Sequence, residues 1–346
     1  MSGKMLRRIL IATVAVLLLS GCAAPAAQSR DRVYEATFLT LFDTVTTIKG
    51  TAESQEVFEE TAGQIRDKLE YYHQLFDIYH DYPGMNNLKT VNDQAGIAPV
   101  AVDEALIALL LDCKDYYDLT GGMVNVAMGG VLQLWHEARN DALGDPANAR
   151  LPDGAKLETA ARHMDIRRVE IDEEAGTVYL SDPEMRLDVG AVAKGWSVQQ
   201  VAQTLPEGIL LSVGGNICAT GPKYPDTPWV VGVRDPAGTA QDYLHTLYVS
   251  GGSVVTSGDY QRAYTVDGRL YHHIIDPETR MPSQYWRSVS VICDDSALAD
   301  VLSTALFLLP LEQGQALAEK CGVGVLWVNA AGEEFMTDLF QERIKG

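Results

Sequence analysis

Strands that follow one another along the chain, with helices gathered between them, restrict the fold more than any other feature of this sequence. A doubly wound sheet alternates strand and helix regularly, whereas runs of strands separated by groups of helices are typical of α+β proteins. We therefore expect an α+β fold with antiparallel sheets and packed helices. The predicted strands lie at 33–49, 169–172, 178–181, 186–189, 209–213, 217–220, within 229–256, and at 323–328 and 334–336.

The longest helix is expected between Ser54 and Phe76, where Ile65, Leu69 and Tyr72 recur near a 3.6-residue period. The segments 79–96 and 140–155 are predicted to be a polar loop and a surface excursion. No internal repeat or long linker divides the chain, whose length suits one large domain or two lobes. Further helices are predicted at 103–118, 124–138, 192–205, 296–309 and 311–320.

The N-terminus has the pattern of an export signal. Three basic residues precede an apolar run, Ile9–Leu19, which is too short to cross a membrane comfortably. The following Leu-Ser-Gly-Cys resembles a bacterial lipoprotein signal. The resemblance implies cleavage after residue 21, acylation (palmitate) of Cys22, a tether over 22–32, and anchoring on the extracytoplasmic face of the cell membrane. The alternative is an ordinary secretory signal with a chance cysteine.

Charge limits the classes of partner. The chain has 47 acidic and 27 basic residues, a net charge of −20, and residues 1–21 contain only basic charges. Such a protein is repelled by phosphate backbones, so we expect no nucleic-acid partner. An anionic ligand must instead be bound by a local positive group, such as a metal ion or a helix N-terminus.

The four cysteines after Cys22 do not indicate a zinc site. No pair of them has CxxC spacing, and each lies in apolar sequence. We interpret Cys113, Cys218, Cys293 and Cys321 as buried small hydrophobic residues.

The segment 256–282 has the strongest chemical pattern. Alternating residues on either side of Asp267-Gly268 predict a hairpin with a type I′ turn, and the returning strand leads into His272 and His273. Asp276 follows closely and could orient a ring nitrogen, which would give an imidazole able to accept a proton near neutral pH. The alternative is a hairpin that ends in two satisfied polar residues.

Asp300 and Thr304 are four residues apart in an apolar helix, so they share one face. A carboxylate on such a face must be paired, hydrogen-bonded or metal-bound. Carboxylate and hydroxyl oxygens suit Mg²⁺, which accepts few protein ligands. The alternative is Asp300 in a buried hydrogen bond.

Three glycine-containing segments could approach a ligand closely. Residues 187–195 predict a strand, a glycine turn and a helix start from which Lys194 projects. Gly214-Gly215-Asn216 separates two apolar strands, and 122–135 is rich in small residues. Each of these segments could instead be only a tight turn or a close helix contact. The loop around Tyr79 is either part of the surface or one wall of a pocket.

Five segments together, in order and spacing, resemble one family. They are FDT at 42–44, NVAMGGVLQLW at 125–135, DVGAVAKGW at 188–196, GGN at 214–216, and TSGDYQR, YHHIIDP and ADVLSTALF within 256–307. The chain is similar over most of its length to the ApbE family, the FAD:protein FMN transferases. Arg280 stands where a glycine is frequent in that family.

The resemblance implies a T-fold-like α+β domain over 33–340, with FAD bound in a cleft between lobes. Mg²⁺ would be held by the Ala191 carbonyl, Asp300 and Thr304, and His273 would be the base. The other residues implied in FAD binding are Phe42, Tyr79, Ala127, Met128, Gly129, Asp188, Lys194, Gly214, Gly215, Asn216 and Ile274.

The implied reaction moves FMN from FAD to a Ser or Thr hydroxyl of an exported or membrane-bound acceptor protein. It forms a phosphoester and releases AMP. Two alternatives stay open at this point. The same groups would serve an FAD pyrophosphatase that gives FMN and AMP, and a flavin-binding lipoprotein would carry out no chemistry.

Overall fold

The computed structural model describes residues 32–39, 41–239 and 242–345. The predicted signal over 1–21 and the acylated Cys22 lie outside these residues, as does the tether except for its last residue. Among the described helices, none combines the length and the apolar character needed to cross a membrane.

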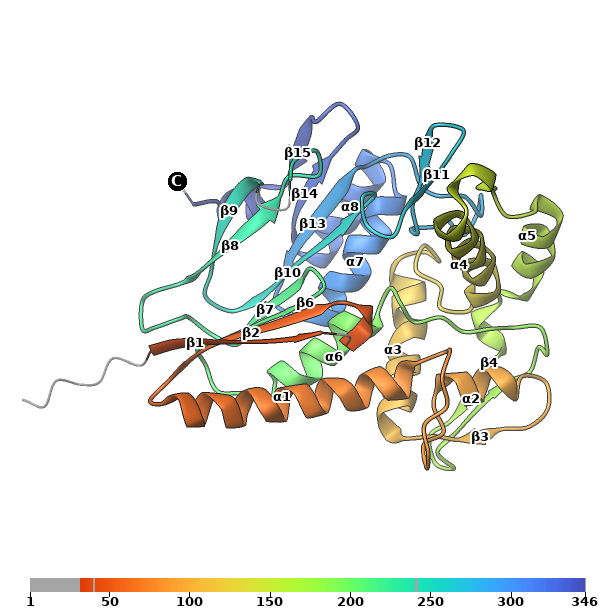
Figure 1. The fold of residues 1–346 in the computed structure, drawn as a ribbon, viewed down its shortest axis with the longest axis horizontal. Helices are drawn as coiled ribbons and strands as arrows, with labels where there is room; N and C mark the ends of the chain where they lie inside the picture. Colours follow the sequence, from red (N-terminus) through yellow and green to blue (C-terminus); the bar gives the residue numbers. More distant parts are fainter. Residues whose placement is uncertain (1–31, 40, 240–241, 346) are drawn as a thin grey trace, which may run out of the picture.

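An eight-stranded sheet forms the centre of the molecule (Figure 1). Its strand order is β1–β2–β6–β7–β10–β13–β14–β15, and every neighbouring pair is antiparallel. This arrangement confirms the predicted α+β class. The strands are β1 (Arg32–Leu39), β2 (Val45–Ala52), β6 (Ile209–Val213), β7 (Asn216–Ala219), β10 (Gly252–Gly258), β13 (Ser288–Cys293), β14 (Gly324–Val328) and β15 (Glu334–Met336).

Helix α7 (Ser296–Leu308) packs on strands β10 and β13 in the main core. It begins where Asp295 accepts a hydrogen bond from the Leu298 amide, and it is buried almost all round because its sequence is apolar on nearly every face. Helix α6 (Ala193–Ala202) lies against α7. Helix α8 (Leu311–Cys321) follows α7 along the chain. The contact of α6 with α7 brings distant parts of the chain together.

The segment predicted as one strand over 33–49 is instead a hairpin. Strands β1 and β2 pair from Arg32–Ala52 to Leu39–Val45, and the 3-10 turn η1 (Leu41–Asp43) lies between them. Phe42 and Asp43 have positive φ angles of 51° and 54°. The turn contains neither glycine nor proline, so alternation on both sides reads as one continuous strand. Helix α1 (Gln55–Phe76), predicted correctly, runs beside this hairpin (Figure 1).

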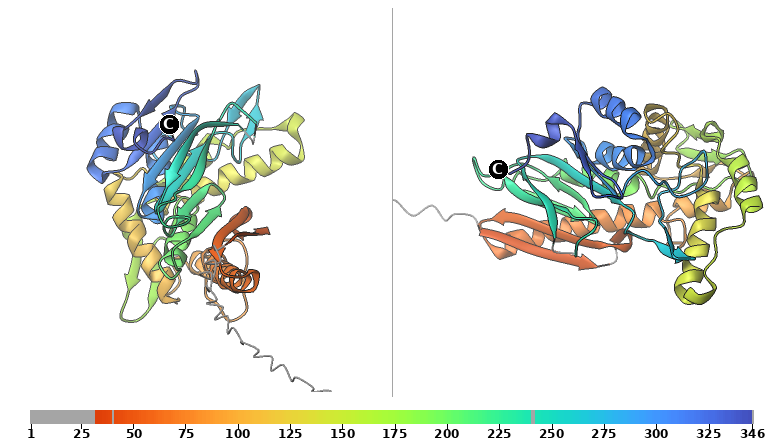
Figure 2. Two further views of the ribbon diagram at one scale, coloured as in Figure 1. Left: turned by 90° about the vertical axis from the view of Figure 1, so that its left-hand side faces the viewer. Right: turned by 90° about the horizontal axis from the view of Figure 1, so that it is seen from above.

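A second group of elements lies beyond the end of α1 (Figure 2). It contains α3 (Glu104–Leu119), α4 (Gly129–Gly144), α5 (Gly154–Ala160) and a small sheet of β3 (Val100–Ala101), β5 (Thr177–Leu180) and β4 (Val169–Asp172). Three predictions need correction here. The loop 79–96 contains α2 (Leu88–Asp93), which an Asn87–Thr90 capping box starts. The helix predicted from 124 begins at Gly129, and the excursion 140–155 includes the end of α4 and the start of α5.

The predicted strand 186–189 is also wrong, because only Arg186 makes a single β-bridge, to Met128. The buried side chain of Asn92 instead bonds both main-chain groups of Leu187, at 2.7 Å and 3.0 Å. The Asp188 amide donates to the Val126 carbonyl. The extended backbone is therefore satisfied by a side chain and a loop rather than by a sheet neighbour.

Two hairpins complete the fold. Strands β8 (Trp229–Arg234) and β9 (Tyr243–Val249) pair with each other, as do β11 (Tyr264–Val266) and β12 (Arg269–Tyr271). Helix α9 (Asp338–Gln341) packs on β14. Of the cysteines, Cys113 and Cys218 are fully buried in hydrophobic clusters as expected, whereas Cys293 and Cys321 are half-buried.

Candidate active site

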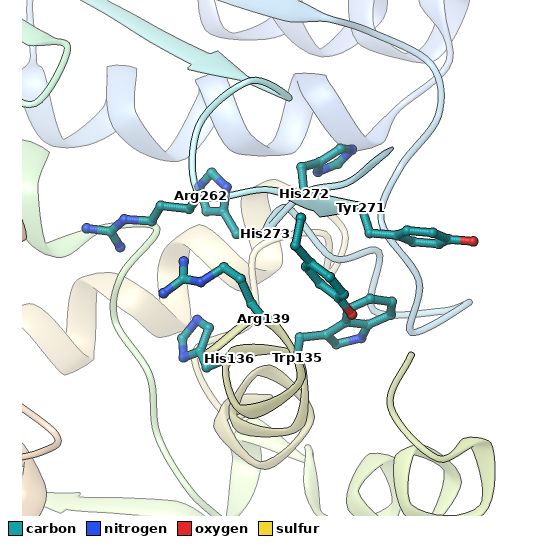
Figure 3. A pocket seen from close by; sticks show the side chains of 8 residues that line it. Trp135, His136, Arg139, Arg262, Tyr271, His272 and His273 are labelled. Atoms are coloured by element: carbon teal, nitrogen blue, oxygen red, sulfur yellow. The ribbon is translucent and has the colours of Figure 1, made fainter. Parts of the chain in front are cut away.

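The β11–β12 hairpin delivers two histidines to the site. Asp267 and Gly268 have φ angles of 49° and 78°, as a type I′ turn requires, so the turn prediction is confirmed. Strand β12 ends at Tyr271, and His272 and His273 follow directly. Their side chains point in different directions (Figure 3).

His272 has a structural role. Its ring is buried, its Nδ1 accepts a hydrogen bond from the Ile274 amide at 3.2 Å, and its Nε2 donates to the Ser283 carbonyl at 2.8 Å. Both ring nitrogens are therefore used, and only the neutral Nε2–H tautomer fits both partners. Burial lowers the pKa of His272, which keeps this form.

His273 is arranged as a base. Its Nδ1 lies 3.1 Å from the Gln261 carbonyl oxygen, which can only accept, so Nδ1 carries the proton and Nε2 is left with its lone pair. Burial and the nearby Arg262 guanidinium lower the pKa of His273 to about 3. The imidazole is therefore neutral at physiological pH and able to accept a proton.

Asp276 does not orient either histidine, which corrects its predicted catalytic role. Its Oδ1 accepts hydrogen bonds from the amides of Glu278 and Thr279, at 2.7 Å and 3.1 Å, and so closes a local turn. The Gln261 carbonyl takes the orienting place instead. Arg280, at the end of this turn, has a φ of 60°, a conformation that glycine adopts at lower cost.

Asp300 lies at the contact of α6 and α7. Its carboxylate is buried, and its Oδ2 accepts a 2.8 Å hydrogen bond from the Gly195 amide. The Lys194 ammonium lies 3.3 Å from the same oxygen. A Cβ on Gly195 would come within 2.4 Å of both the Asp300 Cβ and the Ser296 carbonyl, so only glycine permits this approach. The structure therefore brings Lys194 and Asp300 into contact.

The groups around Asp300 fit a hard divalent cation. Gly195 gives its amide to Asp300 rather than to the carbonyl of Ala191, and no described residue donates a hydrogen bond to that carbonyl. Thr304 is half-buried and lies one turn after the buried Asp300 on α7. Within the described ranges, no three His, Cys, Asp or Glu side chains gather into a metal cluster. A cation here would thus rely on one carboxylate with neutral oxygens, which suits Mg²⁺ bound also by phosphate.

The glycine turn before Asn216 is tightly packed against neighbouring elements. Gly214 and Gly215 have φ angles of 56° and 92°, and a Cβ on Gly214 would meet the Thr44 side chain at 2.6 Å. The buried Asn216 side chain accepts from the Ser296 hydroxyl, while its Nδ2 has no partner among the described residues. Asn216 Nδ2 lies near Gly195, so this turn borders the Asp300 region.

The other predicted residues divide into two groups. Phe42 and Asp188 are half-buried and Tyr79 is exposed, and the Tyr79 hydroxyl lies 3.0 Å from His136 Nδ1. The side chains of these three are therefore at least partly open to solvent. In contrast, the side chains of Ala127, Met128 and Ile274 are buried in hydrophobic clusters, and Gly129 packs on the Arg186 carbonyl. The side chains of Ala127, Met128 and Ile274 thus contribute to core packing.

Three residues that the sequence reasoning did not select lie beside His273. His136 and Arg139 come from α4, Arg262 follows β10, and all three line a pocket with His273 (Figure 3). Burial lowers the pKa of both His136 and Arg139. The three-residue spacing of His136 and Arg139 places them on one helix face. The sequence around them does not indicate that this face lies next to Arg262.

Comparison with known proteins gives a consistent result. A model of the ApbE family matches residues 42–327. The chain is 38% identical over 262 residues to an FAD:protein FMN transferase of Treponema pallidum, covering 70% of each chain. It is 31% identical to one of Klebsiella pneumoniae, covering 74% of this chain and 80% of the relative.

Solved structures agree with these matches. The crystal structure of an ApbE protein from Thermotoga maritima superposes with a TM-score of 0.80 at 28% identity, covering 91% of this chain and all of that one. The flavin transferase ApbE from Vibrio cholerae has the same fold, with a TM-score of 0.73 at 24% identity, and covers 90% of this chain and 100% of its own.

Proposed function

This chain belongs to the ApbE family, and from that premise we propose that it transfers the FMN moiety of FAD to a hydroxyl of an acceptor protein. The enzyme is a transferase and FAD is its substrate. The observation that carries the proposal is the arrangement of His273, a buried imidazole whose Nδ1 faces the Gln261 carbonyl at 3.1 Å and whose Nε2 keeps its lone pair.

The reaction follows from these positions. The oxygen of an acceptor Ser or Thr attacks the FMN-side phosphorus of FAD while its proton passes to His273 Nε2. The bond from that phosphorus to the bridging oxygen breaks, and AMP leaves with the oxygen. The product is a phosphoester between FMN and the acceptor. Since the anhydride of FAD is already activated, no further nucleotide is consumed.

Charge on the phosphoryl oxygens is the main obstacle to such a transfer. Lys194 is placed to offset part of this charge, and Asp300 holds the ammonium in position at 3.3 Å. We infer that Mg²⁺ is held by the Ala191 carbonyl, Asp300 and Thr304, whose fit is described above. When bound, the cation would neutralise part of the negative charge on the pyrophosphate oxygens.

We also propose that the protein acts outside the cytoplasm, anchored through acylated Cys22, and that its acceptor is exported or membrane-bound. The support is the lipoprotein-like pattern before Cys22. Labelling of the full chain with a palmitate analogue in cells, with Cys22→Ser as the control, tests the anchor. Equal labelling of both proteins would contradict it.

The transfer is tested by incubating the protein with FAD, Mg²⁺ and a candidate acceptor protein, followed by mass spectrometry. A gain of one FMN residue on a Ser or Thr is expected. FMN and AMP without a modified acceptor would indicate a pyrophosphatase, and FAD binding without turnover would indicate a carrier.

A further inference from the structure

Helices α6 and α7 meet along a seam that two polar bonds define. Asp300 Oδ2 accepts from the Gly195 amide at 2.8 Å, and one turn earlier on α7 the Ser296 amide donates to Gln199 Oε1, also at 2.8 Å. Gly195 and Gln199 are themselves one turn apart on α6, so the two bonds are successive links between helices that run in opposite directions. We call these four residues the α6–α7 seam. The position of Asp300 is therefore linked to the bonds that Ser296 makes.

Asn216 fastens the α6–α7 seam to the central sheet. It is the first residue of β7, where it pairs with Val213 of β6 and Val255 of β10. Its Oδ1 accepts a hydrogen bond from the Ser296 hydroxyl at 2.8 Å, and both side chains are buried. Ser296 is thus held from two directions, through its hydroxyl by the sheet and through its amide by α6.

Gly195 is enclosed by groups of the same network. A Cβ at this position would lie 2.4 Å from the Asp300 Cβ, 2.4 Å from the Ser296 carbonyl oxygen and 3.1 Å from Asn216 Nδ2. The main chains of the two helices are therefore in direct contact here, one turn after Ala191. Any shift of α7 along α6 would change the separation between the Asp300 carboxylate and the first turn of α6.

The energetics of Asn216 argue against a role in stability alone. Its Nδ2 is buried and has no hydrogen-bond partner among the described residues. Such a donor is destabilising, whereas replacement of both members of a buried polar pair by apolar groups of the same shape can be neutral or stabilising. Helix α7 is apolar on nearly every face, and apolar packing is not directional. Directional bonds such as those of Ser296 are therefore needed to fix where α7 lies along α6.

We propose that Asn216 is a positioning residue for the divalent-cation site. By holding Ser296 it fixes α7 on α6, and this sets the distance between the Asp300 carboxylate and the Ala191 carbonyl. The inference rests on the proposed binding of Mg²⁺ by these oxygens. Because Mg²⁺ demands near-ideal octahedral geometry, with ligands at about 2.0–2.1 Å, a displaced ligand weakens its binding. In this role Asn216 contacts neither the cation nor FAD.

The test measures how strongly Mg²⁺ protects the FAD-bound protein against heat. Wild type, Asn216→Ala, Ser296→Ala and the double variant are titrated with Mg²⁺ in the presence of FAD, and the rise in Tm gives an apparent Kd. Each single variant should weaken this Kd about tenfold, as for other residues that orient metal ligands. The double variant should lie within about twofold of the weaker single variant, because both changes remove the same hydrogen bond. The Kd for FAD without Mg²⁺ should stay within about twofold of the wild type.

Ser303→Ala is the matched control. Ser303 is also a fully buried serine of α7, but its hydroxyl bonds Ser257 Oγ of β10 at 2.8 Å and the Asp300 carbonyl of its own helix at 2.9 Å. The substitution therefore removes a buried hydroxyl from α7 without touching the α6–α7 seam. It should lower Tm about as much as Ser296→Ala, while the apparent Kd for Mg²⁺ stays within about twofold of the wild type.

Four results would overturn the positioning role and leave the transfer function intact. They are a wild-type apparent Kd for Mg²⁺ in both single variants, a loss of about a hundredfold in the double variant, a loss in Ser303→Ala equal to that in Ser296→Ala, and a fall of about tenfold in the affinity of Asn216→Ala for FAD without Mg²⁺. The last would assign the Asn216 side chain to FAD itself.

A separate result concerns the cation site. If Mg²⁺ does not raise the Tm of the FAD-bound wild type, the proposed cation site is rejected and the positioning role with it. Mass spectrometry of the acceptor protein then decides independently whether FMN is transferred.

Discussion

The Gly195 amide donates its hydrogen bond to Asp300 Oδ2, at 2.8 Å, instead of continuing the first turn of its own helix. This exchange has two consequences. It gives a buried carboxylate a main-chain donor, and it leaves the Ala191 carbonyl without a partner from the described residues. The start of α6 and the middle of α7 thereby form one oxygen-rich site.

Asp300→Asn should remove the response to Mg²⁺. The amide keeps the shape of the side chain but not its charge, so we expect transfer to fall about 10²–10³-fold, the range for loss of one electrostatic contact to a reacting group. Activity measured across a Mg²⁺ titration checks this. Asp295→Asn on the same helix is the control, since Asp295 only caps α7. An Asp300→Asn protein with the wild-type Mg²⁺ curve would remove Asp300 from the metal site.

The sequence predicted those elements whose signals are local. Helix α7 has a capping Asp295 before a long apolar run, and the β11–β12 turn has Asp267-Gly268. In the sequence, residues 186–189 resemble a strand because Leu187 and Val189 alternate with polar residues. Both of these apolar side chains are buried in the structure. Their actual partner is the side chain of Asn92, far away in the chain, and no local pattern reports such a bond.

The same distinction applies to the site. Asp300 could be singled out because a carboxylate on an apolar helix face requires a partner. Asp276 was assigned wrongly because an aspartate before proline can satisfy itself through local turn amides. Arg139 and Arg262 meet only through tertiary packing of α4 on the hairpin, so neither neighbourhood in the sequence reveals the pair.

The pH dependence of transfer should follow His273. Its pKa is lowered to about 3, so the free enzyme carries a neutral base throughout the range from pH 5 to 8. Since kcat/KM reports the free enzyme, its acid limb should lie below pH 5. Initial rates at low FAD concentration across this range check the prediction. The prediction is contradicted if the kcat/KM of the wild type falls about tenfold between pH 7 and 5.5 while the residual kcat/KM of His273→Gln stays constant. That result would show that the pKa of His273 is not lowered.

Stability should depend on the same two histidines. The pKa values of His272 and His273 are lower in the folded protein than in the unfolded chain, so the unfolded chain binds more protons between the two values. The free energy of unfolding should therefore reach its full value above about pH 6.5, the pKa of an unperturbed histidine. It should decrease as the pH falls toward the pKa values that the two histidines have in the folded protein. Urea unfolding at several pH values measures this. His273→Gln should reduce the slope.

Asp276 offers a test that separates catalysis from turn formation. Asp276→Asn keeps an Oδ1 acceptor for the amides of Glu278 and Thr279, so activity and stability should stay near those of the wild type. Asp276→Ala removes the acceptor and should cost about 1 kcal/mol of unfolding free energy. Thermal unfolding and transfer rates are measured together. A loss of about a hundredfold in transfer by Asp276→Asn, at unchanged stability, would restore a catalytic role.

Two adjacent glycines at the start of α4 should respond in opposite ways. A Cβ on Gly129 would lie 2.5 Å from the Arg186 carbonyl, so Gly129→Ala must push apart the segment that leads to Asp188. We expect a loss of about 1–3 kcal/mol in unfolding free energy and weaker FAD binding. A Cβ on Gly130 meets nothing closer than the Ala160 side chain at 3.7 Å, so Gly130→Ala should be neutral or stabilising by up to about 1 kcal/mol. Urea unfolding and FAD fluorescence titration of both variants test the pair, and equal destabilisation by the two alanines would contradict the close contact at Gly129.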